Sequence, residues 1–329
     1  MKIKTRYYLL PAIVCLLGAA ALGYYLAFTT FSTASDTFYL YVDDDDTVDS
    51  VTAKLQGIST EHAIAGLTTM MRHTGYADRP RTGRYAIEPA MTTIDVMRRL
   101  RNGHQTPVRL IIPEVRTMDQ LAGKLAQKLM LDSTTIAAYL TADTIAALFV
   151  PDTYEVYWNI SAESLMKRME REHDAFWNDK RRRQAADKGL TPTQVCILAS
   201  IIDEETANNA EKPAIAGMYL NRLRLNMPLQ ADPTVKFALK DFALRRVLNK
   251  HLEVESPYNT YRNNGLPPGP IKIASQKGID AVLNAEENNY LYMCAKEDFS
   301  GTHNFATTLS EHQRNAARYA RALNERGIK

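Results

Sequence analysis

TPTQVCILASIIDEETANNAEKPAIAGMYLNRLRLNMPLQADPT, residues 191–234, is the stretch that decides the fold of this chain. It begins with a helix start signal, since Thr191 can cap, Pro192 suits the first helical position and Gln194 completes a Thr-x-x-Gln capping box. The apolar residues that follow recur at helical spacing, which predicts an amphipathic helix packed into a core. These positions are Val195, Leu198, Ile201 and Ile202.

The same helix runs into three consecutive carboxylates, Asp203, Glu204 and Glu205. At about 100° per residue, Glu205 falls almost on the azimuth of Leu198, whereas Asp203 and Glu204 turn toward the wetter side. Apolar surroundings raise the pKa of a carboxyl group and let it hold a proton near neutrality, which a general acid requires. The alternative for the same residues is a solvated helix end followed by a polar loop.

The composition is that of an ordinary globular chain with room for two or three domains. Apolar residues make up 45% of the 329 positions and charged residues 23%. The net charge of +3 is only mildly basic, and no RNP-like, zinc-finger or phosphate-loop pattern occurs in the sequence. We therefore expect no nucleic-acid partner, no metal and no cofactor.

The cysteines also fit no metal or redox pattern. Cys15 lies in the apolar N-terminal run, Cys196 beside the helix stripe and Cys294 in an expected strand. We expect buried free thiols, and a Cys196–Cys294 disulfide in an oxidising compartment is the alternative.

A charge-free run at the N-terminus covers residues 7–28 and follows three basic residues within positions 2–6. Twenty-two residues are enough to span a bilayer, and the tyrosines at both ends suit its interfaces. The basic residues before the apolar run predict a cytoplasmic N-terminus. Everything after Phe28 is then expected to be extracytoplasmic, and the chain to be a single-pass protein of the inner membrane. A signal peptide cleaved near residues 19–21 is the alternative.

The sequence pattern after the linker predicts a strand–helix–helix–strand unit over residues 37–87. Strands are expected at residues 37–42, 83–87 and 108–113, and a helix at 59–72. Three further helices are expected after Thr47, Thr92 and Thr117, because each begins the pattern Thr-x-x-x-(Val/Leu)-x-x-(Lys/Arg)-Leu and each Thr is a plausible N-cap. A supporting domain and a glycan binder both remain open for this unit.

From residue 114 to 190 the chain is predicted to be mainly helical, with a loop and short strand in 148–161 and one long charged helix over 162–187. A second helix of the decisive stretch begins near Pro213. Further helices are expected at 275–284 and after a turn at residue 301, and a strand at 290–295. His303 has no nearby Ser or Cys pattern for a catalytic triad, so we expect it to lie on the surface or to pack in a loop.

The loop SPYNTYRNNGLPPGPI, residues 256–271, combines prolines with tyrosines, asparagines and a threonine. Planar side chains stack on sugar rings while amides and hydroxyls pair with ring hydroxyls, so this composition suits a sugar-binding wall. A plain turn is the alternative.

Four ordered segments resemble the YceG-like (MltG-like) family of endolytic murein transglycosylases. They are LASIIDEET (198–206), YLNRLRLNMPLQADPTV (219–235), SPYNTYRNNGLPPGPI (256–271) and THNFATTLSEH (302–312). The resemblance implies an α+β fold, with a membrane helix and linker in residues 1–36, a LysM-like βααβ module in 37–108 and a lysozyme-like mixed α/β catalytic domain in 109–329.

The resemblance implies cleavage of MurNAc–GlcNAc bonds inside nascent glycan strands, which ends elongation and leaves a 1,6-anhydroMurNAc end. Glu205 is the catalytic candidate, because the family motif Glu-x-Glu-Thr here starts with Asp203 and only its second Glu is kept. Expected partners are peptidoglycan glycan strands, the inner membrane and peptidoglycan synthases. The substrate-binding candidates are Ser200, Gln230, Asp232, Asn259, Thr260, Tyr261 and Asn264.

Two other functions stay open. One is a hydrolase, or muramidase, in which the same acid works with Asp232 or Asp203 to activate water. The other is a non-catalytic scaffold that binds glycan at the membrane.

Overall fold

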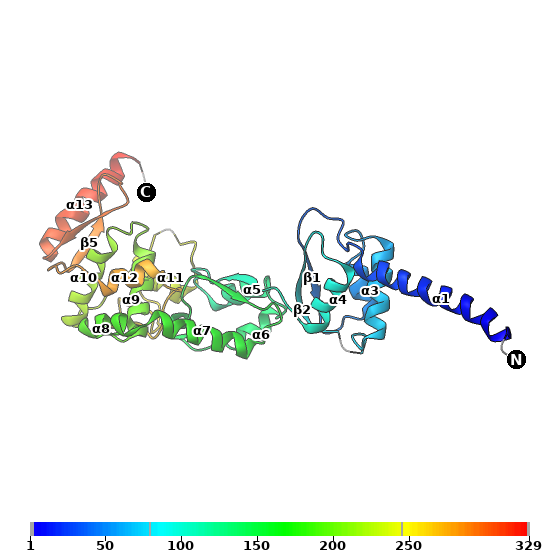
Figure 1. Ribbon diagram of the computed structural model, residues 1–329. Helices are drawn as coiled ribbons and strands as arrows, with labels where there is room; N and C mark the ends of the chain where they lie inside the picture. Colours follow the sequence, from blue (N-terminus) through cyan, green and yellow to red (C-terminus); the bar gives the residue numbers. More distant parts are fainter. Residues whose placement is uncertain (1–2, 79, 245, 328–329) are drawn as a thin grey trace. The chain divides into compact units, whose positions relative to one another are not determined.

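The computed structural model describes residues 3–78, 80–244 and 246–327 and is shown in Figure 1. The chain divides into two compact units. The N-terminal unit comprises Met1–Leu110, Lys128–Leu131 and Glu155–Ile160, and the C-terminal unit comprises Ile111–Gln127, Asp132–Tyr154 and Ser161–Lys329. The division expected from the sequence, at residue 108, instead placed residues 128–131 and 155–160 in the C-terminal domain.

The N-terminal unit begins with the long helix α1 (Ile3–Phe28), whose part Leu9–Phe28 is long and apolar enough to cross a membrane. The C-terminal end of α1 packs on α3 (Glu61–His73) within the same unit. A Cβ atom at Gly66 would lie 3.0 Å from the backbone oxygen of Leu26, so this glycine permits the close approach of the two helices. Phe31, just after α1, is fully buried in the core of the unit.

A two-stranded antiparallel sheet joins β1 (Phe38–Val42) to β2 (Gly83–Ile87). Between these strands lie α2 (Val48–Lys54) and α3, and α4 (Thr93–Asn102) follows β2, which confirms the expected strand–helix–helix–strand order. Thr47 and Thr92 are the N-caps of α2 and α4, as predicted, and each also forms a capping box with the residue three positions later.

The strands β3 (Val108–Ile111) and β4 (Thr153–Val156) pair with each other in a second sheet, and the chain passes from one unit to the other within both of them. The third sheet lies in the C-terminal unit and is the antiparallel pair β5 (Tyr292–Ala295) and β6 (His303–Ala306). Strand β6 was not predicted, because the sequence favoured a turn leading directly into the last helix.

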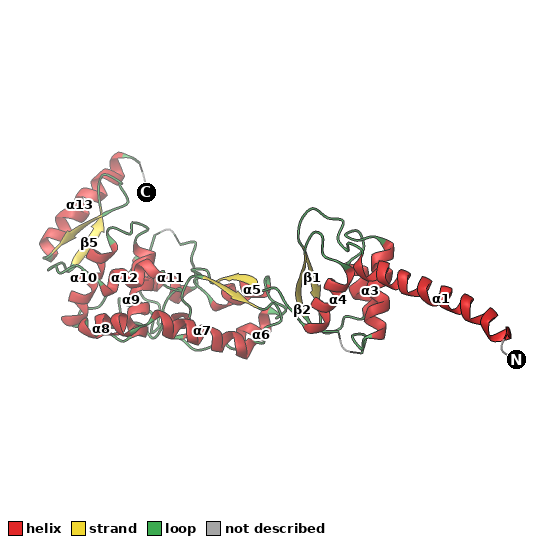
Figure 2. Ribbon diagram, viewed as in Figure 1, coloured by secondary structure: helices red, strands yellow, loops and turns green. Residues whose placement is uncertain are grey.

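Helices dominate the C-terminal unit, as Figure 2 shows. They are α5 (Met118–Ala126), α6 (Ser133–Ala137), η1 (Ile145–Leu148), α7 (Ala162–Phe176), α8 (Asp179–Asp187), α9 (Pro192–Glu205), α10 (Lys212–Arg224), α11 (Asp232–Leu239), η2 (Asn249–His251), α12 (Gln276–Leu283) and α13 (Leu309–Glu325). The single long helix predicted over 162–187 is wrong. The chain breaks at the fully buried Trp177, and Asn178 starts α8 by accepting a hydrogen bond from the backbone N–H of Arg181.

Helix α9 is the centre of the C-terminal unit and contacts α8, α10, α11, α12 and η1. Its predicted start is confirmed, since Thr191, Pro192 and Gln194 form the capping box with proline in the first turn. The predicted one-sided apolar stripe is wrong, because every residue from 195 to 202 is buried. Neighbouring helices therefore cover all sides of α9, and its polar C-terminal end supplies the site. Cys196 is buried within it as a free thiol, and Cys294 is also free.

Candidate active site

Glu205 is the last residue of α9 and lies beside Tyr219 of α10. The Tyr219 hydroxyl donates a hydrogen bond of 2.8 Å to Oε1 of Glu205. The residue keeps some solvent exposure, but the protein packed around its carboxyl group raises the pKa of Glu205 to about 7. Glu205 therefore exchanges a proton near neutral pH.

Burial is the largest influence on the pKa of Glu205. The hydrogen bond from Tyr219 lowers this pKa, because the hydroxyl stabilises the carboxylate form. The negative charge of Asp232 raises it, and the nearby His303 and Lys236 lower it. Among the described residues no group hydrogen-bonds Oε2 of Glu205, so this oxygen is the one available to hold and transfer a proton.

A second pair of polar groups lies at the start of α11, where Tyr261 donates a hydrogen bond of 2.6 Å to Oδ1 of Asp232. Both side chains are partly exposed, and both interact electrostatically with Glu205. Burial and the Asp232 carboxylate together raise the pKa of the Tyr261 hydroxyl, so it remains a proton donor. The structure thus groups Glu205, Asp232 and Tyr261, as predicted.

Gln230 precedes this pair and is exposed. Its backbone φ of 51° lies in the left-handed region, which is costly for a residue with a side chain and is found where the surroundings hold it. The buried Arg222 provides part of that support, since its Nη1 lies 3.3 Å from Oε1 of Gln230 and also donates to the backbone oxygen of Leu229.

Asn259 and Thr260 are fully buried, in contrast to the prediction that they line the cleft. The amide of Asn259 donates to the backbone oxygens of Leu252 and Val254. Thr260 accepts a hydrogen bond from the backbone N–H of Gln230 through its carbonyl oxygen and one from Ala231 through its hydroxyl. These two residues therefore hold the loops that present Gln230, Asp232 and Tyr261.

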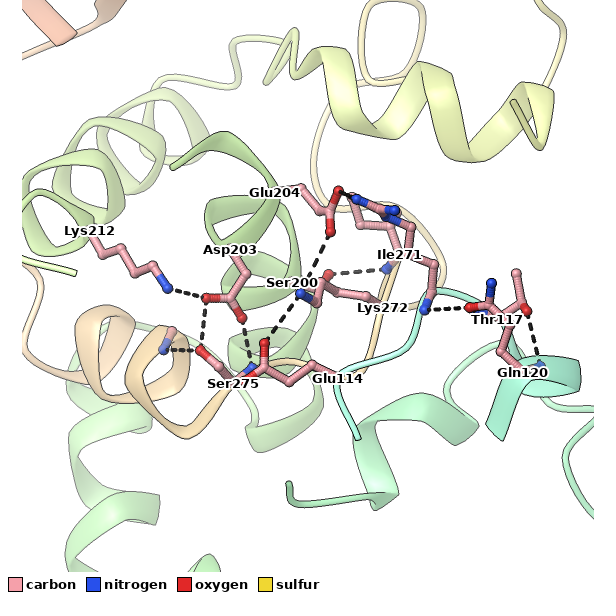
Figure 3. A network of polar contacts seen from close by, with 12 residues as sticks. Glu114, Thr117, Gln120, Ser200, Asp203, Glu204, Lys212, Ile271, Lys272 and Ser275 are labelled. Carbon is pink, nitrogen blue, oxygen red and sulfur yellow. Dashed lines mark hydrogen bonds and ion pairs between the residues drawn. The ribbon is translucent and has the colours of Figure 1, made fainter. Parts of the chain in front are cut away.

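Ser200 is also buried, and its hydroxyl donates to the backbone oxygen of Ile197 and accepts from the N–H of Ile271. It fastens the 256–271 loop to α9 and does not face solvent, so its predicted contact with substrate is wrong (Figure 3). Asn264 is exposed, as expected, and its amide donates to the backbone oxygen of Asn226.

The prediction that Asp203 turns toward solvent is wrong, because its side chain is only 2% exposed. Its Oδ1 lies 2.6 Å from Nζ of the buried Lys212, and its carboxylate also accepts hydrogen bonds from the N–H and the hydroxyl of Ser275 (Figure 3). A Cβ atom on Gly278 would lie 2.6 Å from Oδ1 of Asp203, so α12 approaches the carboxylate closely. Asp203 thus joins the beginnings of α10 and α12 to α9.

Glu204 faces a different set of partners. Its Oε2 accepts hydrogen bonds of 3.0 Å and 2.8 Å from Nε and Nη2 of Arg116, and its Oε1 lies 3.6 Å from Nζ of Lys272. Figure 3 shows that Glu204 and Asp203 contact different groups of side chains. The three consecutive carboxylates therefore have separate surroundings.

Two features of the site were not predicted. The first is the hydrogen bond from Tyr219 to Glu205, which depends on how α10 packs against α9 and has no local sequence signal. His303 is the first residue of strand β6 and does not lie in the expected loop; its Nδ1 lies 2.9 Å from Oε2 of Glu211, and the same carboxylate accepts a hydrogen bond from the backbone N–H of His303. Nothing in the sequence links these two residues, which are far apart along the chain.

Comparisons with known proteins agree on one family. A model of the YceG-like family matches residues 40–318. An endolytic murein transglycosylase of Bacillus subtilis is 37% identical over 169 residues, which is 50% of this chain and 45% of that protein. An endolytic murein transglycosylase of Streptococcus pneumoniae is 26% identical over 293 residues, which is 75% of this chain and 52% of that protein. The chain thus spans about half the length of the curated relatives it matches.

The fold agrees with the same family. The crystal structure of a YceG-like protein from Listeria monocytogenes superposes with a TM-score of 0.53 and 27% identity, covering 85% of this chain and 99% of that one. The family match extends over most of the sequence and includes the helix that carries Glu205. The chain belongs to the YceG-like family.

Proposed function

We propose that this chain is an endolytic murein transglycosylase, with Glu205 as its single acid and base. The observation that carries the proposal is the carboxyl group of Glu205, which burial holds at a pKa of about 7 and which accepts a hydrogen bond from Tyr219. A group that is protonated and deprotonated in comparable amounts near neutrality can serve both halves of a transglycosylation.

In the first half, protonated Glu205 donates its proton to the glycosidic oxygen between MurNAc and GlcNAc, and the bond from that oxygen to C1 of MurNAc breaks. The substrate's own N-acetyl group stabilises the positive charge that develops at C1. In the second half, the Glu205 carboxylate takes the proton of the C6 hydroxyl, whose oxygen bonds to C1. The products are a free GlcNAc hydroxyl and a 1,6-anhydroMurNAc end, no water is consumed, and Glu205 recovers its proton.

The neighbouring groups have roles that fit this reaction. Asp232 lies close enough to influence Glu205 electrostatically, and its negative charge favours positive charge at C1. Tyr261 hydrogen-bonds the Asp232 carboxylate, and the exposed Gln230 and Asn264 would bind sugar hydroxyls and amides.

The surroundings of the acidic triplet favour this reaction over a hydrolase in which Asp203 activates water. Both oxygens of Asp203 already accept hydrogen bonds from Lys212 and Ser275. A hydrolase that uses Asp232 instead would leave a reducing end with water added, which the mass of the product distinguishes.

The rest of the chain is proposed to place this site at the membrane. Helix α1 would anchor the chain in the inner membrane with its N-terminus in the cytoplasm, and residues 37–108 would form a LysM-like module ahead of a lysozyme-like catalytic domain, residues 109–329. Peptidoglycan synthases are the expected neighbours, because the substrate is a nascent strand.

The test is cleavage of uncrosslinked glycan strands by the purified full chain in detergent, with product masses as the readout. Glu205→Gln is expected to lower the rate by about 10²–10⁴-fold, because the amide cannot donate or accept the proton. Glu204→Gln is the matched control, since it changes the adjacent carboxylate in the ion pair with Arg116. Cleavage by Glu205→Gln at the wild-type rate would contradict the assignment, and failure of the wild-type chain to cleave would favour the scaffold.

A further inference from the structure

A cavity of about 480 Å³ lies next to the acidic triplet, on the side of Glu204. The segment 114–127 forms one wall, and Glu204 and Lys272 form the other. All of these residues belong to the C-terminal unit. The volume is in the range of small-ligand sites, and no residue of this cavity has a part in the reaction proposed above.

This cavity leads toward the reacting group. A smaller cavity of about 40 Å³ shares Arg116 and Glu204 with it and extends to Pro233 and Lys236 of α11. Lys236 in turn interacts electrostatically with Glu205. A ligand in the larger cavity would therefore lie along the same surface as a glycan strand bound at Glu205.

One face of α5 lines the larger cavity with groups suited to a peptide. Gln120, Lys124 and Gln127 are spaced at i, i+4 and i+7, so they share this face, and all three are exposed. Gly123 lies among them, and a Cβ atom built on it meets nothing within 4 Å. Gly123 therefore leaves open space at this wall of the cavity, which a larger side chain would fill.

Some of the positively charged N–H groups in the cavity have no carboxylate partner among the described residues. Glu204 binds Nε and Nη2 of Arg116, while Lys272 is shared between Glu204 and Glu114. Nη1 of Arg116 takes part in neither hydrogen bond to Glu204, and within the described ranges no carboxylate forms an ion pair with Lys124. Two cationic donors therefore remain for a carboxylate that enters from solvent.

We propose that this cavity binds the short peptide carried by the MurNAc residue of the substrate, through a peptide carboxylate held by Lys124 and Arg116. The Nε2 group of Gln120, whose Oε1 already accepts hydrogen bonds from the backbone N–H groups of Arg116 and Thr117, and the amide of Gln127 would pair with the peptide backbone. This inference rests on the proposed function, because the peptide is part of the same substrate. It assigns the chain a preference for peptide-bearing over peptide-free glycan.

The binding test uses the full chain with Glu205→Gln, in detergent, and a synthetic stem tripeptide of alanine, γ-linked glutamate and diaminopimelate with free carboxylates. Lys124→Glu is expected to raise the Kd at least about tenfold, because a charge-assisted hydrogen bond becomes a repulsion. Arg183→Glu, an equal charge reversal on the exposed face of α8, is the matched control and leaves the Kd unchanged.

A second pair of variants tests the cavity without changing charge. Gly123→Leu fills the open space and favours the helix, so the chain folds and the Kd rises at least about tenfold, whereas Gly123→Ala has a smaller effect. In the catalytically active chain, we compare the rate of cleavage of peptide-bearing glycan with that of peptide-free glycan. Lys124→Glu and Gly123→Leu are each expected to lower the ratio of these two rates by the factor by which they raise the Kd for the tripeptide.

The results separate this inference from the proposed function. Wild-type affinity for the tripeptide in both Lys124→Glu and Gly123→Leu, or an unchanged cleavage ratio, would overturn the peptide site. If the wild-type chain cleaves neither glycan but binds the tripeptide with the predicted variant effects, the transglycosylase proposal fails and the binding site stands.

Discussion

Replacing Glu205 by Gln is expected to stabilise the C-terminal unit above pH 8 and to have little effect on its stability near pH 4. Burial raises the pKa of Glu205 in the folded chain to about 7, compared with an ordinary value of 4.5. The folded state therefore binds the proton more tightly than the unfolded state. Its free energy of unfolding falls as the pH rises from about 4.5 to about 7, and it stays lower above that range.

The size of the effect follows from the same two pKa values. Each pKa unit corresponds to about 1.36 kcal/mol, so ionising Glu205 costs the folded chain about 3 kcal/mol at alkaline pH. Glutamine has a similar shape and does not ionise. The difference in the free energy of unfolding between Glu205→Gln and wild type is thus expected to increase by about 3 kcal/mol between pH 4 and pH 8.5.

Urea unfolding at several pH values measures this difference in the full chain in detergent. Trp177 is fully buried in the C-terminal unit, and in a Trp158→Phe background its fluorescence reports on that unit. Glu204→Gln controls for the loss of a neighbouring carboxylate. If wild type and Glu205→Gln show the same pH dependence, the pKa of Glu205 is not raised and the carboxyl group is not held protonated for catalysis.

Two further changes test the partners of the triplet. Tyr219→Phe removes the hydroxyl that stabilises the Glu205 carboxylate, so the pKa of Glu205 rises further and the loss of activity at alkaline pH moves up by roughly one pH unit in a pH–rate profile. An unshifted alkaline limb would show that the hydrogen bond does not influence the reacting group. Asp203→Asn leaves the ammonium of Lys212 buried without its charge partner, and we expect a loss of about 3–5 kcal/mol in urea unfolding. The double variant Asp203→Asn, Lys212→Met should recover part of this loss, and no recovery would mean that the ion pair is not the source of the destabilisation.

Local signals explain why parts of the fold were predictable from the sequence. The N-caps predicted at Thr47, Thr92 and Thr117 and the capping box predicted at Thr191 depend on residues three positions apart, and all four threonines cap their helices. The break between α7 and α8 was missed because it depends on the burial of Trp177, a tertiary contact that a helical pattern does not contain.

The residues of the candidate site were likewise predictable only in part from local sequence patterns. Helical phase predicted that Glu205 turns toward the protein interior, and burial does raise the pKa of its carboxyl group, but the same phase placed Asp203 on the wetter side, although its side chain is only 2% exposed. It could not show that Asn259 and Thr260 turn inward, because loop composition gives residue types but no direction for their side chains. Their buried hydrogen bonds to backbone groups are visible only once the loop is folded.

The acidic triplet itself shows what phase can and cannot decide. Successive residues of a helix point about 100° apart, so three neighbouring carboxylates must meet three different surroundings when a helix is covered on all sides. In α9 these are the ion pair of Asp203 with Lys212, the ion pairs of Glu204 beside a cavity, and the hydroxyl of Tyr219 next to Glu205. The first two have cationic partners. Glu205 has a neutral hydrogen-bond partner instead, so of the three it is the one that burial can keep protonated, and the chemistry follows from that difference in partners.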